Sequence, residues 1–260
     1  MARTHPYLHI AIYALVMSTI VWGIYQGAVS TGYRWQWHRI PPYLFEWQDG
    51  ELVRGYLIDG LLVTLRISAQ AFVLMVVIGL VTALLSASNS LVGRWLARGY
   101  VEIIRNTPLL VQLYLIYFAL SPVLGLDRMT AAILTLALFE GAYASEIIRG
   151  AVAAVPQGQS EAARALGLGA FATTRLVVLP QALRLMLPPL TGQTVSLIKD
   201  SSIVSVIAVF DLTTEARNIA SDTFLVFEVW FTVAALYLAL TVTLSFAVTA
   251  FEHRLKRSPV

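Results

Sequence analysis

The chain has 260 residues, of which 58% are apolar and only 13% charged, and its mean hydropathy is +0.73. A soluble domain carries about 25% charged residues on average, so the composition excludes an ordinary soluble protein and indicates lipid as the surrounding solvent. The net charge of +3 comes without any basic run interleaved with aromatic residues, which argues against a nucleic-acid partner, and the lack of cysteine excludes disulfides and thiolate metal sites.

Apolar runs of about 20 residues, the length that spans a bilayer as a helix, predict an all-α integral membrane protein with six transmembrane helices. We expect Pro188, Pro189 and Gly192 to interrupt the fifth of these helices near its start. The first run is too long for a cleaved signal peptide and is predicted to be an uncleaved helix. In chain order the runs cover about residues 10–29, 57–87, 100–122, 129–148, 185–209 and 224–251.

Lysine and arginine set the orientation, because cytoplasmic loops carry the excess of positive charge. Alternating six helices so that most of these residues face the cytoplasm puts both termini there, in a multi-pass protein of the bacterial inner membrane. The longest outer segment, about residues 30–56, is rich in aromatic rings and is expected to serve as an interfacial anchor or as a contact surface for an external partner. We divide the chain into an N-terminal part, 1–56, and a transmembrane part, 57–257.

A long polar loop between the fourth and fifth spans carries the strongest local signal. Residues 159–166 are good helix formers, with Ser160 as the expected N-cap and Gly167 as the left-handed residue that ends the helix. Pro180 suits the first turn of the next helix. The loop therefore predicts a short cytoplasmic helix, a turn and a segment that returns to the membrane.

Small side chains dominate this short helix. We expect it to expose Ala162, Ala163 and Ala165 together with Leu166, so that a partner surface can approach its backbone closely. The sequence favours equally a helix seated in a groove of another protein and a helix lying on the inner face of its own chain.

These residues resemble the EAA motif of ABC importer permeases. Glu161-Ala162-Ala163, then Gly167, then Leu179-Pro180 match E-A-A-x-x-x-G followed by I-x-L-P, with Val177 in place of the usual Ile. Further segments resemble the polar amino acid branch of that family. They are residues 60–65, 102–112, 142–150 and 199–202.

The resemblance implies a five-helix type I importer core preceded by one additional N-terminal helix. It also implies a second permease subunit, identical or different, two ATPase subunits that each receive one such coupling helix, and a periplasmic binding protein that delivers a polar amino acid. The motif residues expected to couple the permease to the ATPase are Glu161, Ala162, Ala163, Gly167, Leu179 and Pro180. Because no G-x-x-x-x-G-K-[ST] is present, ATP and Mg belong to the partner ATPase, and this chain is expected to be a transport subunit with no cofactor and no catalytic residue.

Ionisable residues inside the bilayer are costly and usually face protein or water. Glu140 has no charged partner one turn away, so it is a candidate for binding a substrate ammonium, with a pair to Lys199 as the structural alternative. The polar stretch after Gly192 is expected to line the pathway or the permease dimer interface, or to hold a kinked helix through a Lys199–Asp200 network. The proposed pathway residues are Glu140, Tyr143, Gln193, Lys199, Asp200 and Ser201.

Two pairs at i,i+3 spacing are expected to be structural ion pairs, Glu102–Arg105 and Glu146–Arg149. A secondary transporter or channel without an ATPase is the alternative function, and the coupling loop argues against it. A membrane enzyme is disfavoured, because the histidines show no metal-ligand spacing and no nucleophile elbow occurs.

Overall fold

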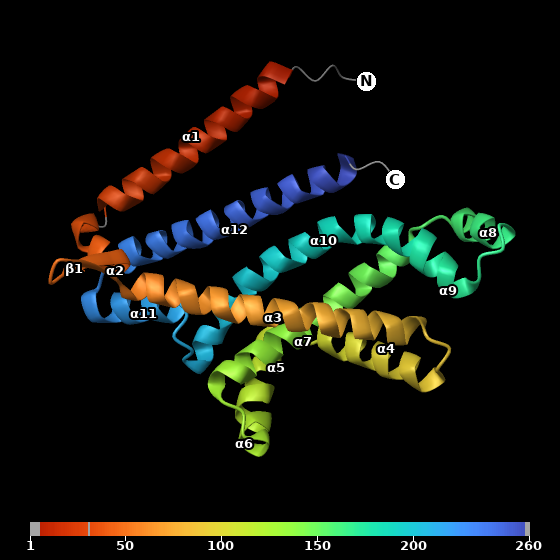
Figure 1. Cartoon of the computed structure of the whole chain (residues 1–260). Helices are drawn as coiled ribbons and strands as arrows, with labels where there is room; N and C mark the ends of the chain where they lie inside the picture. The colour runs from red at the N-terminus through yellow and green to blue at the C-terminus, as the bar shows by residue number, and fades with distance from the viewer. Residues whose placement is uncertain (1–5, 31, 258–260) are drawn as a thin grey trace. The chain divides into compact units, whose positions relative to one another are not determined.

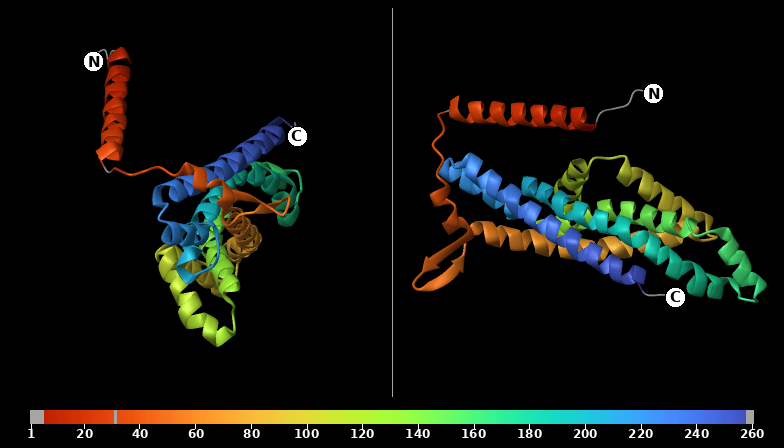
Figure 2. Two further views of the ribbon diagram at one scale, coloured as in Figure 1. Left: turned by 90° about the vertical axis from the view of Figure 1, so that its left-hand side faces the viewer. Right: turned by 90° about the horizontal axis from the view of Figure 1, so that it is seen from above.

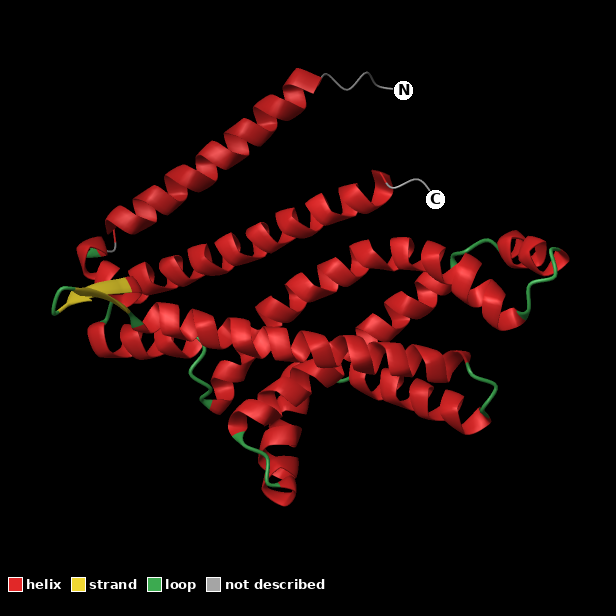
Figure 3. Ribbon diagram, in the orientation of Figure 1, coloured by secondary structure: helices red, strands yellow, loops and turns green. Residues whose placement is uncertain are grey.

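The computed structural model describes residues 6–30 and 32–257, and nearly all of them are helical. Figure 3 shows this composition, with one small two-stranded sheet among the helices. The chain divides into two units, Met1–Arg39 and Ile40–Val260. The terminal residues 1–5 and 258–260, which we expect in the cytoplasm, lie outside the described residues.

The first unit contains one long helix, α1 (Pro6–Ser30), and a short 3₁₀ turn, η1 (Trp37–Arg39). Residues His9–Ser30 of α1 are apolar enough to span a membrane, and none of that stretch is buried by the described chain. After the helix, the rings of Trp35 and Trp37 stack with their centroids 5.8 Å apart.

The second unit begins with α2 (Pro41–Leu44) and a hairpin of β1 (Phe45–Gln48) and β2 (Glu51–Arg54), paired antiparallel. Asp49 and Gly50 make its two-residue turn, both with positive φ. Ile40 and its neighbours pack with Leu57, Leu212 and Leu225 in one apolar cluster. Ile40, Tyr43 and Leu44, which fall in the N-terminal part predicted from the sequence, therefore pack with the second unit, while both strands of the hairpin are exposed.

Four long helical segments form the body of the second unit (Figure 1). They are α3 (Tyr56–Ala87), α7 (Arg128–Ala153), α10 (Leu179–Asp200) and α12 (Val226–Arg257). Gly79 of α3 lies against Ala144 of α7, where a built Cβ would come within 2.8 Å of the alanine methyl. The main cluster of buried residues joins α3, α7 and α10 through Met75, Leu136 and Leu197. Among the described residues, five helices are long and apolar enough to cross a membrane, and a bent pair adds a sixth.

That bent pair replaces the straight third span that we expected at about 100–122. Helix α4 (Leu91–Arg105) is followed by α5 (Leu109–Tyr114), the π-helical turn η2 (Leu115–Leu120) and α6 (Ser121–Leu124), after a 108° change of direction. Pro108 causes the break, because a proline ring disfavours helical backbone at the residue before it. The side-chain amide of Gln112 donates to the carbonyl oxygens of Ile104 (2.8 Å) and Thr107 (3.1 Å), which the break leaves without helical partners.

The expected interruption of the fifth span is wrong. α9 (Ala170–Thr173), the π-helical turn η3 (Thr174–Val178), α10 and the 3₁₀ turn η4 (Ser201–Ile207) follow one another as a single span of residues 170–207. Pro188 and Pro189 lie inside α10 on its exposed side. Because Met186 and Leu197 remain buried on the packed side, the helix curves and does not break (Figure 1).

Two shorter helices complete the second unit. α8 (Gln157–Ala165) lies between α7 and α9, and α11 (Leu212–Thr223) precedes α12. Figures 1 and 2 place α8 and α9 at one end of the long helices, with the β1–β2 hairpin and α11 at the other.

Candidate functional site: a short terminal helix and a buried polar cluster

Helix α8 begins and ends through local sequence chemistry. Pro156 occupies the position before its first turn, so Ser160, our expected N-cap, lies inside the helix. At the other end Gly167 has φ +85°, its N–H donates to the carbonyl of Arg164, and the N–H of Leu168 donates to that of Ala163. This is a complete Schellman motif, and it places the expected terminating glycine correctly.

One face of α8 packs on its own chain and the other is open. Ala163 is buried, with 4% of its surface exposed, which contradicts our expectation that it is available to a partner. At 100° per residue, Glu161 and Ala165 both point about 160° away from Ala163. These two residues and Ala162 are exposed, and Leu166 beside them exposes 83% of its surface.

The remaining residues of the expected coupling segment lie along the start of the fifth span. Leu179 and Pro180 are exposed at the first turn of α10. The helical segment starts ten residues earlier than Pro180 predicts, because α9 and η3 run directly into α10. Gly167, in the turn between α8 and α9, has nothing within 4 Å of a built Cβ. The segment is thus a connected but largely uncovered surface at one end of the long helices.

A polar cluster joins α7 to α10 inside the bundle. Glu140 is fully buried, and the side-chain amide of Gln193 donates a hydrogen bond to one of its carboxylate oxygens. Asp200, seven residues along α10 from Gln193, is close enough to repel the same carboxyl group electrostatically, and no hydrogen bond joins the two among the described residues. The other carboxylate oxygen of Glu140 has no partner among the described residues. Three of the six proposed pathway residues therefore meet, although 53 positions separate Glu140 from Gln193.

The other three pathway residues lie elsewhere. Lys199 is exposed, and no ion pair joins it to Glu140 or Asp200 in the described part of the chain, so neither lysine network that we considered is formed. Ser201 is buried and donates to the carbonyl of Ile198 at 2.7 Å. Tyr143 is partly buried one turn from Glu140.

An ionic cluster beside Tyr143 links the bent third span to α7. Glu146 and Arg149 form a two-pronged pair at 2.9 and 2.7 Å. Arg105 lies 3.8 Å from the Glu146 carboxylate, and its guanidinium carbon is 5.3 Å from the centre of the Tyr143 ring. The expected Glu102–Arg105 pair is not among the ion pairs of the described residues, where the side-chain amide of Asn106 instead donates to the Glu102 carboxylate at 3.0 Å.

Two residues that position this region were missed by the sequence reading. Gln112 holds the corner of the third span, and the hydroxyl of Tyr100 donates to the carbonyl of Leu138 on α7 at 2.6 Å. The Thr107-Pro108 step was the available signal for the corner, since the residue before a proline resists helical backbone. Nothing local in the sequence identifies the partner of Tyr100.

Known proteins fit this architecture over most of the chain. Residues 75–257 match a family described as the binding-protein-dependent transport system inner membrane component. The chain belongs to this family. Such a component is a multi-pass protein of the inner membrane that functions with an ATPase, an external binding protein and a second permease subunit. It is a transport subunit and not itself an enzyme.

Individual relatives cover most of this permease. It is 42% identical over 215 residues to the glutamine transport system permease protein GlnP of Escherichia coli (strain K12). The matched region covers 82% of this chain and 98% of that protein. It is 38% identical over 201 residues to the probable glutamine ABC transporter permease protein GlnM of Bacillus subtilis (strain 168), covering 77% and 93%.

Solved structures show the same fold. A crystal structure of an amino acid ABC transporter with histidines has a TM-score of 0.73 at 40% identity, covering 76% of this chain and 94% of that one. The MetNI methionine ABC transporter in an inward-facing conformation has a TM-score of 0.67 at 24% identity and supports the fold alone. The permease is thus an all-α membrane protein of the type I importer fold.

Proposed function

We propose that this permease carries a polar amino acid across the inner membrane as the transmembrane subunit of an ATP-driven importer. The names of its relatives support the substrate class, because they include two glutamine permeases and an amino acid ABC transporter. The two alternatives, a secondary transporter and a channel, would each work without the ATPase that this family requires.

The complex that we infer contains two copies of this chain, or one copy and a related permease, with two ATPase subunits that carry ATP and Mg. We place the α8 end of the bundle and both chain termini in the cytoplasm. The hairpin end then faces the external binding protein. The opposite positions of α8 and the hairpin along the long helices support this orientation.

The observation that carries the proposal is the two-sided character of α8. Its Ala163 face is fixed to η3 and α9, while Glu161 and Ala165 face outward with small or charged side chains. A helix held on one side and open on the other can transmit force from a docked partner to the span that follows it. ATP binding in the partner would then bias the long helices between two states.

We place the substrate pathway at the Glu140–Gln193–Asp200 cluster. A buried carboxylate with one unpartnered oxygen is a suitable acceptor for an α-ammonium group, and the Gln193 amide lies beside it. Tyr143 lies one helical turn away on the same helix. Lys199 and Ser201 lie outside this cluster, and they belong to the proposed pathway only where a second permease subunit completes it.

Reconstitution tests the coupling directly. The permease is purified with its ATPase, placed in proteoliposomes with the binding protein, and assayed for amino acid uptake and ATP hydrolysis. Ala165→Trp, on the outward face of α8, is expected to weaken ATPase capture and lower uptake at least tenfold. Val92→Trp, at an exposed position in the first turn of α4, is the matched control and keeps both activities. Uptake that persists without the ATPase, or in Ala165→Trp at the control level, contradicts the proposal.

A further inference from the structure

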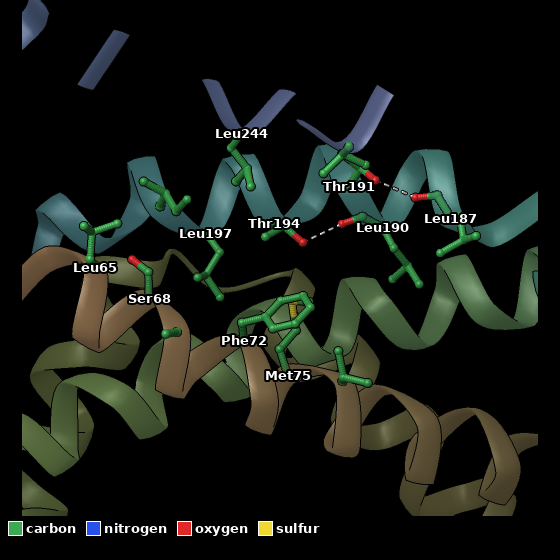
Figure 4. Close-up of a pocket in the computed structure, with 14 residues that line it drawn as sticks. Leu65, Ser68, Phe72, Met75, Leu187, Leu190, Thr191, Thr194, Leu197 and Leu244 are labelled. Carbon is green, nitrogen blue, oxygen red and sulfur yellow. Dashed lines mark hydrogen bonds between the residues drawn. The ribbon is translucent and has the colours of Figure 1, made fainter. Parts of the chain in front are cut away.

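An apolar slot lies between α3, α10 and α12, and none of its lining residues belongs to the Glu140 cluster. Its volume is about 590 Å³, and Figure 4 shows its lining from the α3 and α10 sides. On α3 the lining follows one helical stripe from Leu65 to Val76, and on α10 a stripe with the same spacing from Leu187 to Ile198. From α12 only Leu244 and Val248 reach it, so this wall is thin.

The slot runs along the helices that line it. At about 1.5 Å per residue, each stripe is about 16 Å long, which is close to one leaflet of a hydrocarbon core of about 30 Å. Met75 and Leu197, which line its depth, have no exposed surface in the described chain.

One polar atom in the lining lacks a partner. The hydroxyls of Thr191 and Thr194 donate to carbonyls of their own helix at 2.8 and 2.9 Å, so they turn methyl groups toward the slot (Figure 4). Ser68 is 4% exposed, and its hydroxyl has no hydrogen-bond partner among the described residues. Figure 4 shows that hydroxyl pointing from α3 toward α10, near the Leu65 end of the slot. A buried unsatisfied hydroxyl is costly, and a ligand acceptor at this position would satisfy it.

We propose that this slot binds one acyl chain of a membrane phospholipid, with the ester carbonyl of that chain accepting a hydrogen bond from Ser68. All three walls are membrane-spanning helices, so lipid is the medium around the slot. The slot matches an acyl chain in length and apolarity, and it offers one donor near one end. A chain bound there fills the space between α12 and the α3–α10 pair.

Photolabelling of the full-length permease in phospholipid nanodiscs tests the site. The probe is a phosphatidylcholine with a diazirine in its acyl chain, and labelled peptides are mapped by mass spectrometry. We expect adducts on the α3 and α10 stripes. Leu244→Trp fills the slot from α12 and is expected to lower this labelling at least fivefold, whereas Val242→Trp, exposed on the same helix and outside the slot, leaves it unchanged. Equal labelling in the two variants overturns the proposal.

A second pair of variants protects this test against misfolding. Leu187→Trp is expected to reduce labelling as Leu244→Trp does, with Leu185→Trp on the exposed side of α10 as its control. Because the chain contains no cysteine, Leu244→Cys introduces a single thiol. Efficient disulfide formation between two copies at this position would show that a second permease covers the slot, and would overturn the lipid assignment.

The role of Ser68 has its own readout, which is competition of unlabelled phospholipid against the probe. Ser68→Ala is expected to weaken lipid binding about tenfold, the effect of one lost hydrogen bond of about 1.4 kcal/mol. Ser68→Thr retains the hydroxyl and is expected to bind nearly as the parent does. Unchanged or tighter binding in Ser68→Ala would show that no acceptor meets this hydroxyl.

Discussion

Replacing Gly167 tests whether the end of α8 must keep its shape for transport. The backbone of this residue has φ +85°, a conformation that costs a residue with a Cβ about 1–2 kcal/mol. A Cβ at this position meets nothing within 4 Å, so Gly167→Ala adds backbone strain without a clash. A penalty of 1–2 kcal/mol lowers the population of the correctly ended helix about 5- to 30-fold, relative to conformations in which α8 ends differently.

Gly169 provides the matched control. It lies two residues further along the same turn, has a negative φ of −68°, and also has open space around a built Cβ. Gly169→Ala is therefore expected to behave as the parent does. Gly167→Asn should lie between the two, because asparagine tolerates the left-handed conformation better than alanine does.

The assay is amino acid uptake per ATP hydrolysed in proteoliposomes that contain the ATPase and the binding protein. We expect this ratio to fall in the order parent, Gly167→Asn, Gly167→Ala, with Gly169→Ala at the parent level. Equal ratios for Gly167→Ala and Gly169→Ala would refute the reasoning, because only the first substitution strains the motif that ends α8.

Further predictions concern the interior of the bundle. Gly79→Ala places a methyl group 2.8 Å from the Cβ of Ala144 and should destabilise the permease by about 1–3 kcal/mol, measured by thermal unfolding in detergent, whereas Gly99→Ala meets open space and should be neutral or slightly stabilising. Glu140→Gln keeps a polar partner for Gln193 but removes the carboxylate, so we expect a folded protein whose uptake is at least tenfold lower. Glu140→Ala also leaves the Gln193 amide unpaired and should lower thermal stability as well, by about 1–3 kcal/mol. Uptake by Glu140→Gln at the parent level would leave Glu140 with a purely structural role.

Local sequence determined the spans because each apolar helix satisfies its own backbone in lipid. Local sequence also located the end of the short helix, because Gly167 ends it through hydrogen bonds within a few residues. The third span shows the limit of the approach. It was predicted at about residues 100–122, whereas the bent pair covers residues 91–124. The corner at Pro108 also depends on a side chain, Gln112, that caps carbonyls up to eight residues away.

Contacts between distant segments decided the rest. Arg105 lies 3.8 Å from Glu146 of α7, while Glu102 accepts a hydrogen bond from Asn106, and the i,i+3 spacing of Glu102 and Arg105 does not reveal either contact. Glu140 meets Gln193 only through the packing of α7 on α10, and this packing cannot be predicted from the sequence pattern of either helix alone.

The sequence by itself determined that this protein lies in the membrane and where its short terminal helix stops, because these properties follow from composition and from hydrogen bonds over a few residues. Only the tertiary structure decided which side of that helix is free. Ala162 and Ala163 are adjacent and chemically identical, yet one is exposed and the other buried, since burial depends on η3 and α9 beneath the helix.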